Sequence, residues 1–91
     1  MNNYQYPIDS DWTTDELVKI INFLTLVEQA YESSVDAKAF GQAYDTYRQI
    51  VNSINGQKQL DKKFQQESGY SIYQVVKWWK EHPDAKKIQM K

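Results

Sequence analysis

The segment from Trp12 to Tyr31 constrains the fold of this chain most strongly, because it opens with a complete helix-start signal. Thr13 is suited to cap the helix, and Glu16, three residues later, completes a capping box with it. Trp12 and Leu17 stand where an apolar pair brackets such a start. Apolar residues then recur at the spacing of one broad helix face, namely Leu17, Ile20, Ile21, Phe23, Leu24, Val27, Ala30 and Tyr31. A face this broad predicts a helix with neighbours on more than one side.

A second helix is predicted after Asp36, where the same signal recurs. Asp36 is suited to cap it, and Val35 and Phe40 bracket that cap as the apolar pair. The predicted apolar face of this helix consists of Phe40, Ala43, Tyr44, Tyr47, Val51 and Ile54. We expect the first helix to end near Glu32 or Ser33, so the connection has only three or four residues. A connection this short predicts an antiparallel helical hairpin.

Two further helices are predicted on either side of Gly69, which is suited to the left-handed conformation that ends a helix. The first covers residues 57–68, with Asn55 as its candidate cap. It is expected to be short because it has only two strong apolar anchors, Leu60 and Phe64. Ser71 and Gln74 form the capping box of the next helix. The inward face of that helix is predicted to consist of Ile72, Val75, Val76 and Trp79.

The two ends of the chain complete the predicted fold. Residues 1–12 contain several aromatic side chains and Pro7, which together predict an extended arm packed on the helices. Residues 83–91 form a basic tail that we expect either to fray or to add a last helical turn. The chain is therefore predicted to be a single all-α domain over residues 1–91. Its architecture is a small up-and-down helical bundle of three main helices and one short helix, with an extended N-terminal arm.

Composition limits what such a domain does. The sequence has no cysteine, which excludes disulfides and thiolate chemistry. No apolar run reaches the ~18 residues of a membrane span and no signal peptide is visible, so we expect a cytoplasmic protein without a membrane partner. The net charge is −1, yet residues 1–36 carry seven acidic and one basic side chain and residues 37–91 carry five acidic and ten basic ones. This asymmetry favours docking of the two halves, and a basic nucleic-acid surface is the alternative.

No catalytic constellation is visible. The single histidine, His82, lies at a predicted helix end, and nucleophilic catalysis requires a base beside its nucleophile. Glu81, His82 and Asp84 are too close in sequence to converge on one metal ion from a helix end. Glu28 lies at the edge of the first apolar face. It is either a group for acid–base chemistry, or a structural carboxylate that is hydrogen-bonded to a tyrosine hydroxyl or placed at the rim of the core. We therefore expect no enzyme, no metal and no cofactor.

Two surface segments are candidates for binding. Residues 61–79 resemble a helix-turn-helix, which makes weak DNA or RNA binding the alternative function. Gln65 stands where close helix crossing needs a small residue, and apolar Ile72 and Val76 stand where base-reading polar groups belong, so a plain helical corner is favoured. The favoured function is a protein-interaction module that binds another protein or a second copy of itself. The candidate contact residues lie beside the predicted apolar faces and are Trp78, Tyr73 and Leu26.

Several separated blocks carry a family resemblance. They are residues 4–12 (YQYPIDSDW), the TTDE that follows, residues 28–32 (EQAYE) and residues 68–77 (SGYSIYQVVK). Together they resemble the YktA-like uncharacterised protein family of low-GC Gram-positive bacteria, over about residues 4–78. The resemblance implies a small all-α bundle in the bacterial cytoplasm and assigns no activity or functional residue. The chain is expected to depart from the family pattern after about Lys77, so the resemblance does not extend to Trp78 and Trp79.

Overall fold

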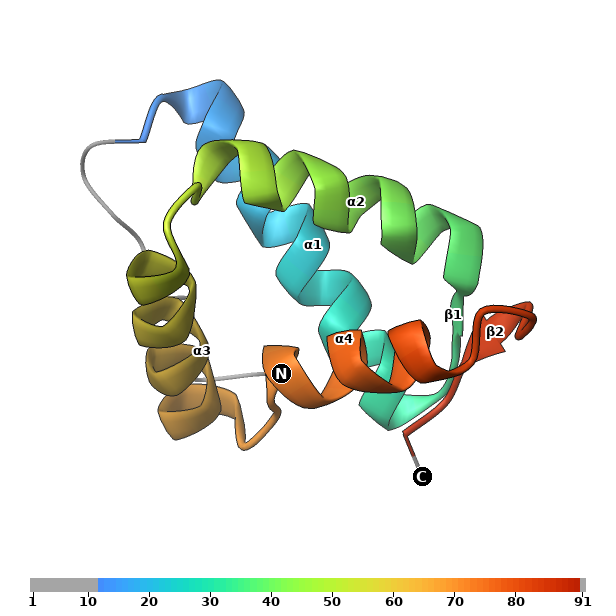
Figure 1. Cartoon of the computed structure of the whole chain (residues 1–91). Helices are drawn as coiled ribbons and strands as arrows, with labels where there is room; N and C mark the ends of the chain where they lie inside the picture. Colours follow the sequence, from blue (N-terminus) through green and yellow to red (C-terminus); the bar gives the residue numbers. More distant parts are fainter. Residues whose placement is uncertain (1–11, 91) are drawn as a thin grey trace.

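The computed structural model of the chain describes residues 12–90 as a helical bundle with one small pair of strands (Figure 1). The elements follow in the order α1 (Thr14–Glu32), β1 (Val35–Asp36), α2 (Ala37–Ile50), α3 (Ile54–Ser68), α4 (Ile72–Glu81) and β2 (Lys87–Ile88). The predicted all-α bundle is confirmed. The arm predicted over residues 1–12 lies outside the described residues except for Trp12, which packs against the core.

The helix starts follow the capping signals in the sequence. Thr13 and Glu16 form the predicted capping box, with reciprocal backbone-to-side-chain hydrogen bonds of 3.0 and 3.1 Å. The carboxylate of Asp36 accepts a hydrogen bond of 2.9 Å from the backbone N–H of Ala39 at the start of α2. Gly69 ends α3 with a φ of 81°, a conformation that only glycine adopts without strain. These local signals fix where α1 and α2 begin and where α3 ends.

The junction between α2 and α3 differs from the prediction. Ser53, not Asn55, caps α3, because its hydroxyl accepts a hydrogen bond of 3.0 Å from the backbone N–H of Gly56. Helix α2 therefore stops at Ile50, and Ile54 begins α3 in solvent instead of extending the buried face of α2. Helix α3 has 15 residues, and the shortest of the four helices in the described chain is α4, with 10. The cap formed by Ser53 is incompatible with a longer α2, so α2 ends and a new helix begins.

In the described part of the tail, Lys87–Ile88 form a short strand, which is neither of the two states expected for residues 83–91. Strand β2 pairs antiparallel with β1, with Val35 opposite Ile88 and Asp36 opposite Lys87. The N–H of Met90 donates to the carbonyl oxygen of Ala30 at 2.8 Å, which extends the contact to α1. Ile88 is fully buried. The described part of the tail therefore packs across the α1–β1–α2 connection, where backbone hydrogen bonds and the buried side chain of Ile88 hold it.

The core is an aromatic cluster between α1 and α2 that α4 completes. Phe23 of α1 stacks on Tyr47 of α2 with 4.5 Å between the ring centroids. Trp79 of α4 meets the rings of Phe40 and Tyr44 edge-on, at 5.7 Å in each case. Such pairs add about 0.5–1.5 kcal/mol each beyond the burial of their surface. In Figure 1, α4 crosses α1 near the C-terminal end of α1, and α3 stands beside the start of α4. The predicted burial of Leu24, Tyr47 and Val75 is confirmed.

Candidate protein-binding groove

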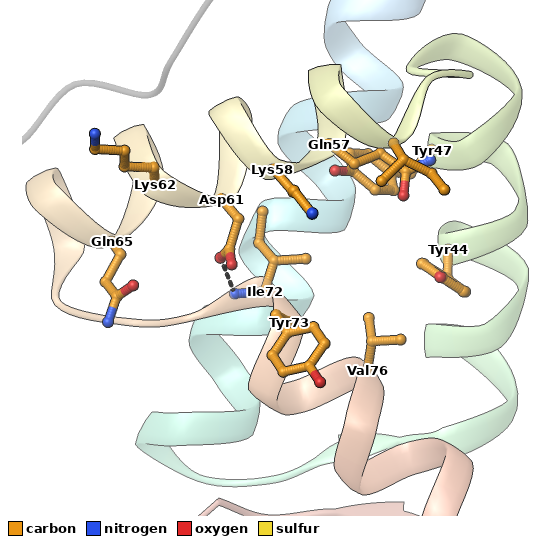
Figure 2. A pocket seen from close by; sticks show the side chains of 11 residues that line it. Tyr44, Tyr47, Gln57, Lys58, Asp61, Lys62, Gln65, Ile72, Tyr73 and Val76 are labelled. Carbon is orange, nitrogen blue, oxygen red and sulfur yellow. Dashed lines mark hydrogen bonds between the residues drawn. The ribbon is translucent and has the colours of Figure 1, made fainter.

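An open groove lies between α2, α3 and α4 (Figure 2). Its volume of about 430 Å³ falls within the ~300–1,000 Å³ of typical ligand sites. The lining residues come from three helices and are Tyr44, Tyr47, Ile54, Gln57, Lys58, Asp61, Lys62, Gln65, Ile72, Tyr73 and Val76. We call this the α2–α3–α4 groove. It exists only because three segments that are separate in sequence pack around a common space.

The groove has a buried apolar floor, and two exposed apolar side chains stand among the polar ones of its walls. Tyr47, Ile72 and Val76 form the floor and are buried. At the walls, the exposed fraction is 72% for Ile54 on α3 and 59% for Tyr73 on α4. Within residues 12–90 only one other large apolar side chain is similarly exposed, Val18 on α1 at 61%. Two of these three side chains therefore line one groove, which is the distribution expected of a binding surface.

Asp61 of α3 fixes the position of α4 at this groove. Its Oδ1 atom accepts a hydrogen bond of 2.7 Å from the backbone N–H of Ile72 (Figure 2). The same atom accepts a longer hydrogen bond of 3.5 Å from the hydroxyl of Ser71. Ser71 also caps α4, because its hydroxyl accepts a hydrogen bond of 3.2 Å from the N–H of Gln74. The carboxylate is thereby placed at the positive end of the α4 dipole. Sequence reasoning missed Asp61, since a cap supplied by another helix has no local signal.

The hydroxyl of Tyr47 stays protonated at neutral pH. Its pKa is raised well above the ordinary tyrosine value, chiefly because burial disfavours the charged form. The negative charge of Asp61 and the neighbouring Tyr44 raise this pKa further. The polar atom at the floor of the groove is therefore a neutral phenol and does not act as a base at neutral pH.

A second hollow of about 470 Å³ adjoins the groove and shares Tyr44, Ile54 and Gln57 with it. Two cations converge on the ring of Tyr44 at this point. The guanidinium carbon of Arg48 lies 5.5 Å from the ring centroid, and the ammonium nitrogen of Lys80 lies 5.8 Å from it. Both distances are within the range of cation–π attraction. Tyr44 thus lies between the groove and a positively charged rim, which we define as Arg48 and Lys80.

Within the described part of the chain, the cations at this surface form no ion pair. Among residues 12–90 the structure has one salt bridge, between Lys19 and Asp15 on α1 at 3.1 Å. Lys58 points from α3 into the space toward α4, whereas Lys62 extends along α3 (Figure 2). Lys58, Arg48 and Lys80 therefore place positive charge at this surface that a ligand can contact.

A sequence model of the uncharacterised protein family UPF0223 matches residues 3–88 of the chain. The chain belongs to the UPF0223 family. A UPF0223 protein of Streptococcus uberis is 45% identical to it over 80 residues, which cover 88% of this chain and 87% of the relative. A UPF0223 protein of Oceanobacillus iheyensis is 45% identical over 75 residues, covering 82% of this chain and 85% of the relative.

These relatives confirm the predicted resemblance to an uncharacterised family of low-GC Gram-positive bacteria. The UPF0223 match runs to residue 88 and so includes Trp78, Trp79 and β2, beyond the expected departure at Lys77. The family is uncharacterised and assigns no role to the groove.

The three contact residues predicted from sequence lie at different places in this UPF0223 chain. Tyr73 lines the groove, and Trp78 and Leu26 are not part of its lining. Trp78 is half-buried and stacks on His82, with 4.0 Å between the ring centroids. Leu26 is half-buried on α1 and packs at the edge of the core. The missed wall residue is Ile54, which the sequence pattern placed on the buried face of α2.

The helix-turn-helix-like segment, residues 61–79, is present as the end of α3, the turn at Gly69 and most of α4. Ile72 and Val76 are buried in the bundle, so they are unavailable to base edges. Lys77 and Lys80 are exposed on α4. The geometry thus supports the interpretation of this segment as a helical corner.

Glu28 is buried on α1, with 6% of its surface exposed, which excludes the predicted rim position. Burial, and then the nearby charge of Glu32, raise its pKa to about 7. Glu28 does not line the α2–α3–α4 groove. Its neighbour Glu32 accepts a hydrogen bond of 3.0 Å from the hydroxyl of Tyr70. The carboxylate of Glu28 is therefore separate from the candidate site.

Within residues 12–90 no three histidine, cysteine, aspartate or glutamate side chains are grouped as a metal site would require. No helix in this range has the length and apolar character needed to cross a membrane.

Proposed function

We propose that this UPF0223 chain is a non-catalytic protein-interaction module of the bacterial cytoplasm, and that its α2–α3–α4 groove binds a segment of another protein. The observation that carries the proposal is the exposure of two large apolar side chains, Ile54 of α3 and Tyr73 of α4, at one groove with a buried apolar floor. Exposed tyrosine and large aliphatic side chains beside a pocket are typical anchors of protein interfaces.

The polar groups of the groove support binding rather than catalysis. Asp61 already accepts the N–H of Ile72, and Tyr47 is held neutral by burial. Acid–base catalysis requires a group that exchanges protons near neutral pH within reach of a substrate. Glu28 has a suitable pKa, of about 7, but it does not line the groove. These features of Asp61, Tyr47 and Glu28 therefore support binding through contact area and orientation.

A matched pair of variants tests the proposal. Ile54 and Val18 are both exposed aliphatic residues on helices, and only Ile54 lines the groove. A protein captured from bacterial lysate by the wild-type chain should be retained by Val18→Glu and lost with Ile54→Glu. The purified partner should then bind the wild-type chain in isothermal titration, with affinity about tenfold or more weaker for Ile54→Glu. Equal binding by both variants would exclude the groove as the site.

Two other outcomes would replace the proposal with an alternative. Sedimentation at several concentrations that shows a dimer abolished by Ile54→Glu would identify the partner as a second copy of the chain. Salt-dependent retention of DNA or RNA, lost with Lys77→Ala and Lys80→Ala together, would favour the nucleic-acid alternative.

Trp78 and Leu26 stay predicted contacts outside the groove. The same capture with Trp78→Ala and Leu26→Ala tests them one by one. Loss of the partner with either variant would extend the interface beyond α2, α3 and α4.

A further inference from the structure

We propose that the segment bound in the α2–α3–α4 groove is acidic and amphipathic, with carboxylates flanking a short row of large apolar side chains. This inference rests on the proposed function and adds the chemistry of the partner. Its basis is the way charge and apolar surface are distributed around Tyr44.

The apolar part of the partner is defined by the groove itself. Its floor is aliphatic and aromatic, Ile54 is the apolar side chain that α3 adds, and Tyr44 continues this surface into the adjoining hollow. Desolvating such a surface is favourable only against other apolar groups. A purely polar or purely charged ligand would therefore leave Ile54 and Tyr73 without a matching surface.

The charged part of the partner is defined by the rim. Arg48 and Lys80 converge on Tyr44 from α2 and α4, and Lys58 points into the groove from α3. A carboxylate placed at the edge of Tyr44 would approach both Arg48 and Lys80, and arginine binds carboxylates in a bidentate manner. These cations make no salt bridge within residues 12–90. Their charge is thus available to steer and orient an acidic segment.

The acidic side chains of this surface are fewer than the basic ones. Asp61 is directed at the start of α4, where it accepts the N–H of Ile72 and offsets the helix dipole. Asp45 lines the hollow on the α2 side. Four basic side chains line the groove and hollow together, against these two acidic ones. A nucleic-acid duplex would meet the same cations, but its phosphates gain nothing from the apolar floor and its bases are already stacked, so a protein segment fits the surface better. A single strand, whose bases are free to stack on tyrosine, is the competing ligand to be measured.

A displayed library of random peptides tests the inference without knowledge of the natural partner. The full-length wild-type chain is the target, and Ile54→Glu is the counter-target that removes peptides bound elsewhere. We expect the enriched peptides to combine large apolar residues with an excess of aspartate and glutamate over lysine and arginine.

Affinities of a labelled enriched peptide then test the charge assignment directly. Lys58→Glu combined with Lys80→Glu should weaken binding by about tenfold or more. The control combines Lys63→Glu with Lys77→Glu, which changes the net charge equally and also takes one exposed lysine from each of α3 and α4. Neither control residue lines the groove or the hollow. The control should change the affinity by less than about threefold, and thermal melts should show that both double variants are folded.

The outcomes separate this inference from the proposed function. Peptides that depend on Ile54 but show no acidic excess, or a basic one, would overturn the acidic partner and leave the protein-binding groove intact. A selection that yields no peptide dependent on Ile54 would overturn both. Labelled DNA and RNA strands are measured in parallel, and binding of these strands but not of peptides, lost with Lys58→Glu and Lys80→Glu, would replace the acidic segment with a nucleic acid.

Discussion

A Cβ atom on Gly41 of α2 would lie 2.8 Å from Cζ2 of Trp79 on α4. Carbon atoms in contact are separated by about 3.5–4.0 Å, so a side chain at this position would displace the indole. The indole meets the rings of Phe40 and Tyr44 edge-on, with 5.7 Å between the ring centroids in each case. The missing side chain of Gly41 is therefore what allows the indole of Trp79 to lie this close to the backbone of α2.

Gly41→Ala is predicted to destabilise the fold by about 1–3 kcal/mol, because the indole cannot move without disturbing the aromatic cluster. Without the clash, alanine in a helix interior would be more favourable than glycine by about 0.5–1 kcal/mol. A decrease in the free energy of unfolding on Gly41→Ala would therefore show that the clash occurs. Urea unfolding monitored by circular dichroism measures it. In a Trp79→Leu background the same substitution should lose most of its cost, and an unchanged cost there would disprove the clash.

Ile88→Ala is predicted to destabilise the fold by about 2–4 kcal/mol, because Ile88 is fully buried where β2 meets β1. Ile54→Ala is the matched control and should change the free energy of unfolding by less than about 0.5 kcal/mol, since Ile54 is exposed. Thermal unfolding of both variants measures the difference. Equal melting temperatures would mean that the C-terminal strand adds nothing to stability.

Asp61→Ala is predicted to cost about 1–2 kcal/mol of stability, because it removes the acceptor of the Ile72 N–H at the start of α4. Amide hydrogen exchange should become faster in the first turn of α4 before the rest of the helix is affected. Asp45→Ala, at an exposed position on α2, is the control and should have little effect. Unchanged protection of the Ile72 amide would contradict the assignment of Asp61 as a cap.

Glu28 is predicted to make stability depend on pH. Its pKa is about 7 in the folded chain against an ordinary value of 4.5, so the folded state binds more protons between these values. Stability contributed by protonated Glu28 is therefore lost as the pH rises from about 4.5 through about 7. At about pH 8, Glu28→Gln should be more stable than the wild type by up to about 3 kcal/mol.

Unfolding curves across this pH range test the assignment of Glu28. The exposed Glu67→Gln is the control and should leave the pH profile as in the wild type. A wild-type stability that does not fall between about pH 5 and about pH 8 would contradict a raised pKa of Glu28.

The helices were predictable where the decisive interaction is local. Thr13, Asp36 and Gly69 act within one helical turn of their position, so their roles appear in the sequence itself. The α2–α3 junction was mispredicted because Ser53 and Asn55 are both good caps and Ile54 fits an apolar period. The hydrogen bond from Gly56 to Ser53 decides between these alternatives.

The candidate site was only partly predictable. Tyr73 was found as an aromatic side chain beside the inward face of its helix, and it does line the groove. The other wall residue, Ile54, was missed because the helical period placed it in the core. Asp61 was missed because it caps a helix that begins eleven residues later, and a partner at that distance has no characteristic spacing.

The sequence by itself determined the all-α class, most helix boundaries and the aromatic residues that form the core. These follow from capping and apolar periodicity, which act over a few residues. Only the tertiary structure decided that Ile88 closes the bundle as a strand and that Tyr44, Ile54 and Tyr73 border one groove. The physical reason is that strand pairing and groove formation depend on contacts between segments far apart in the chain, and such contacts are fixed only when the whole core packs.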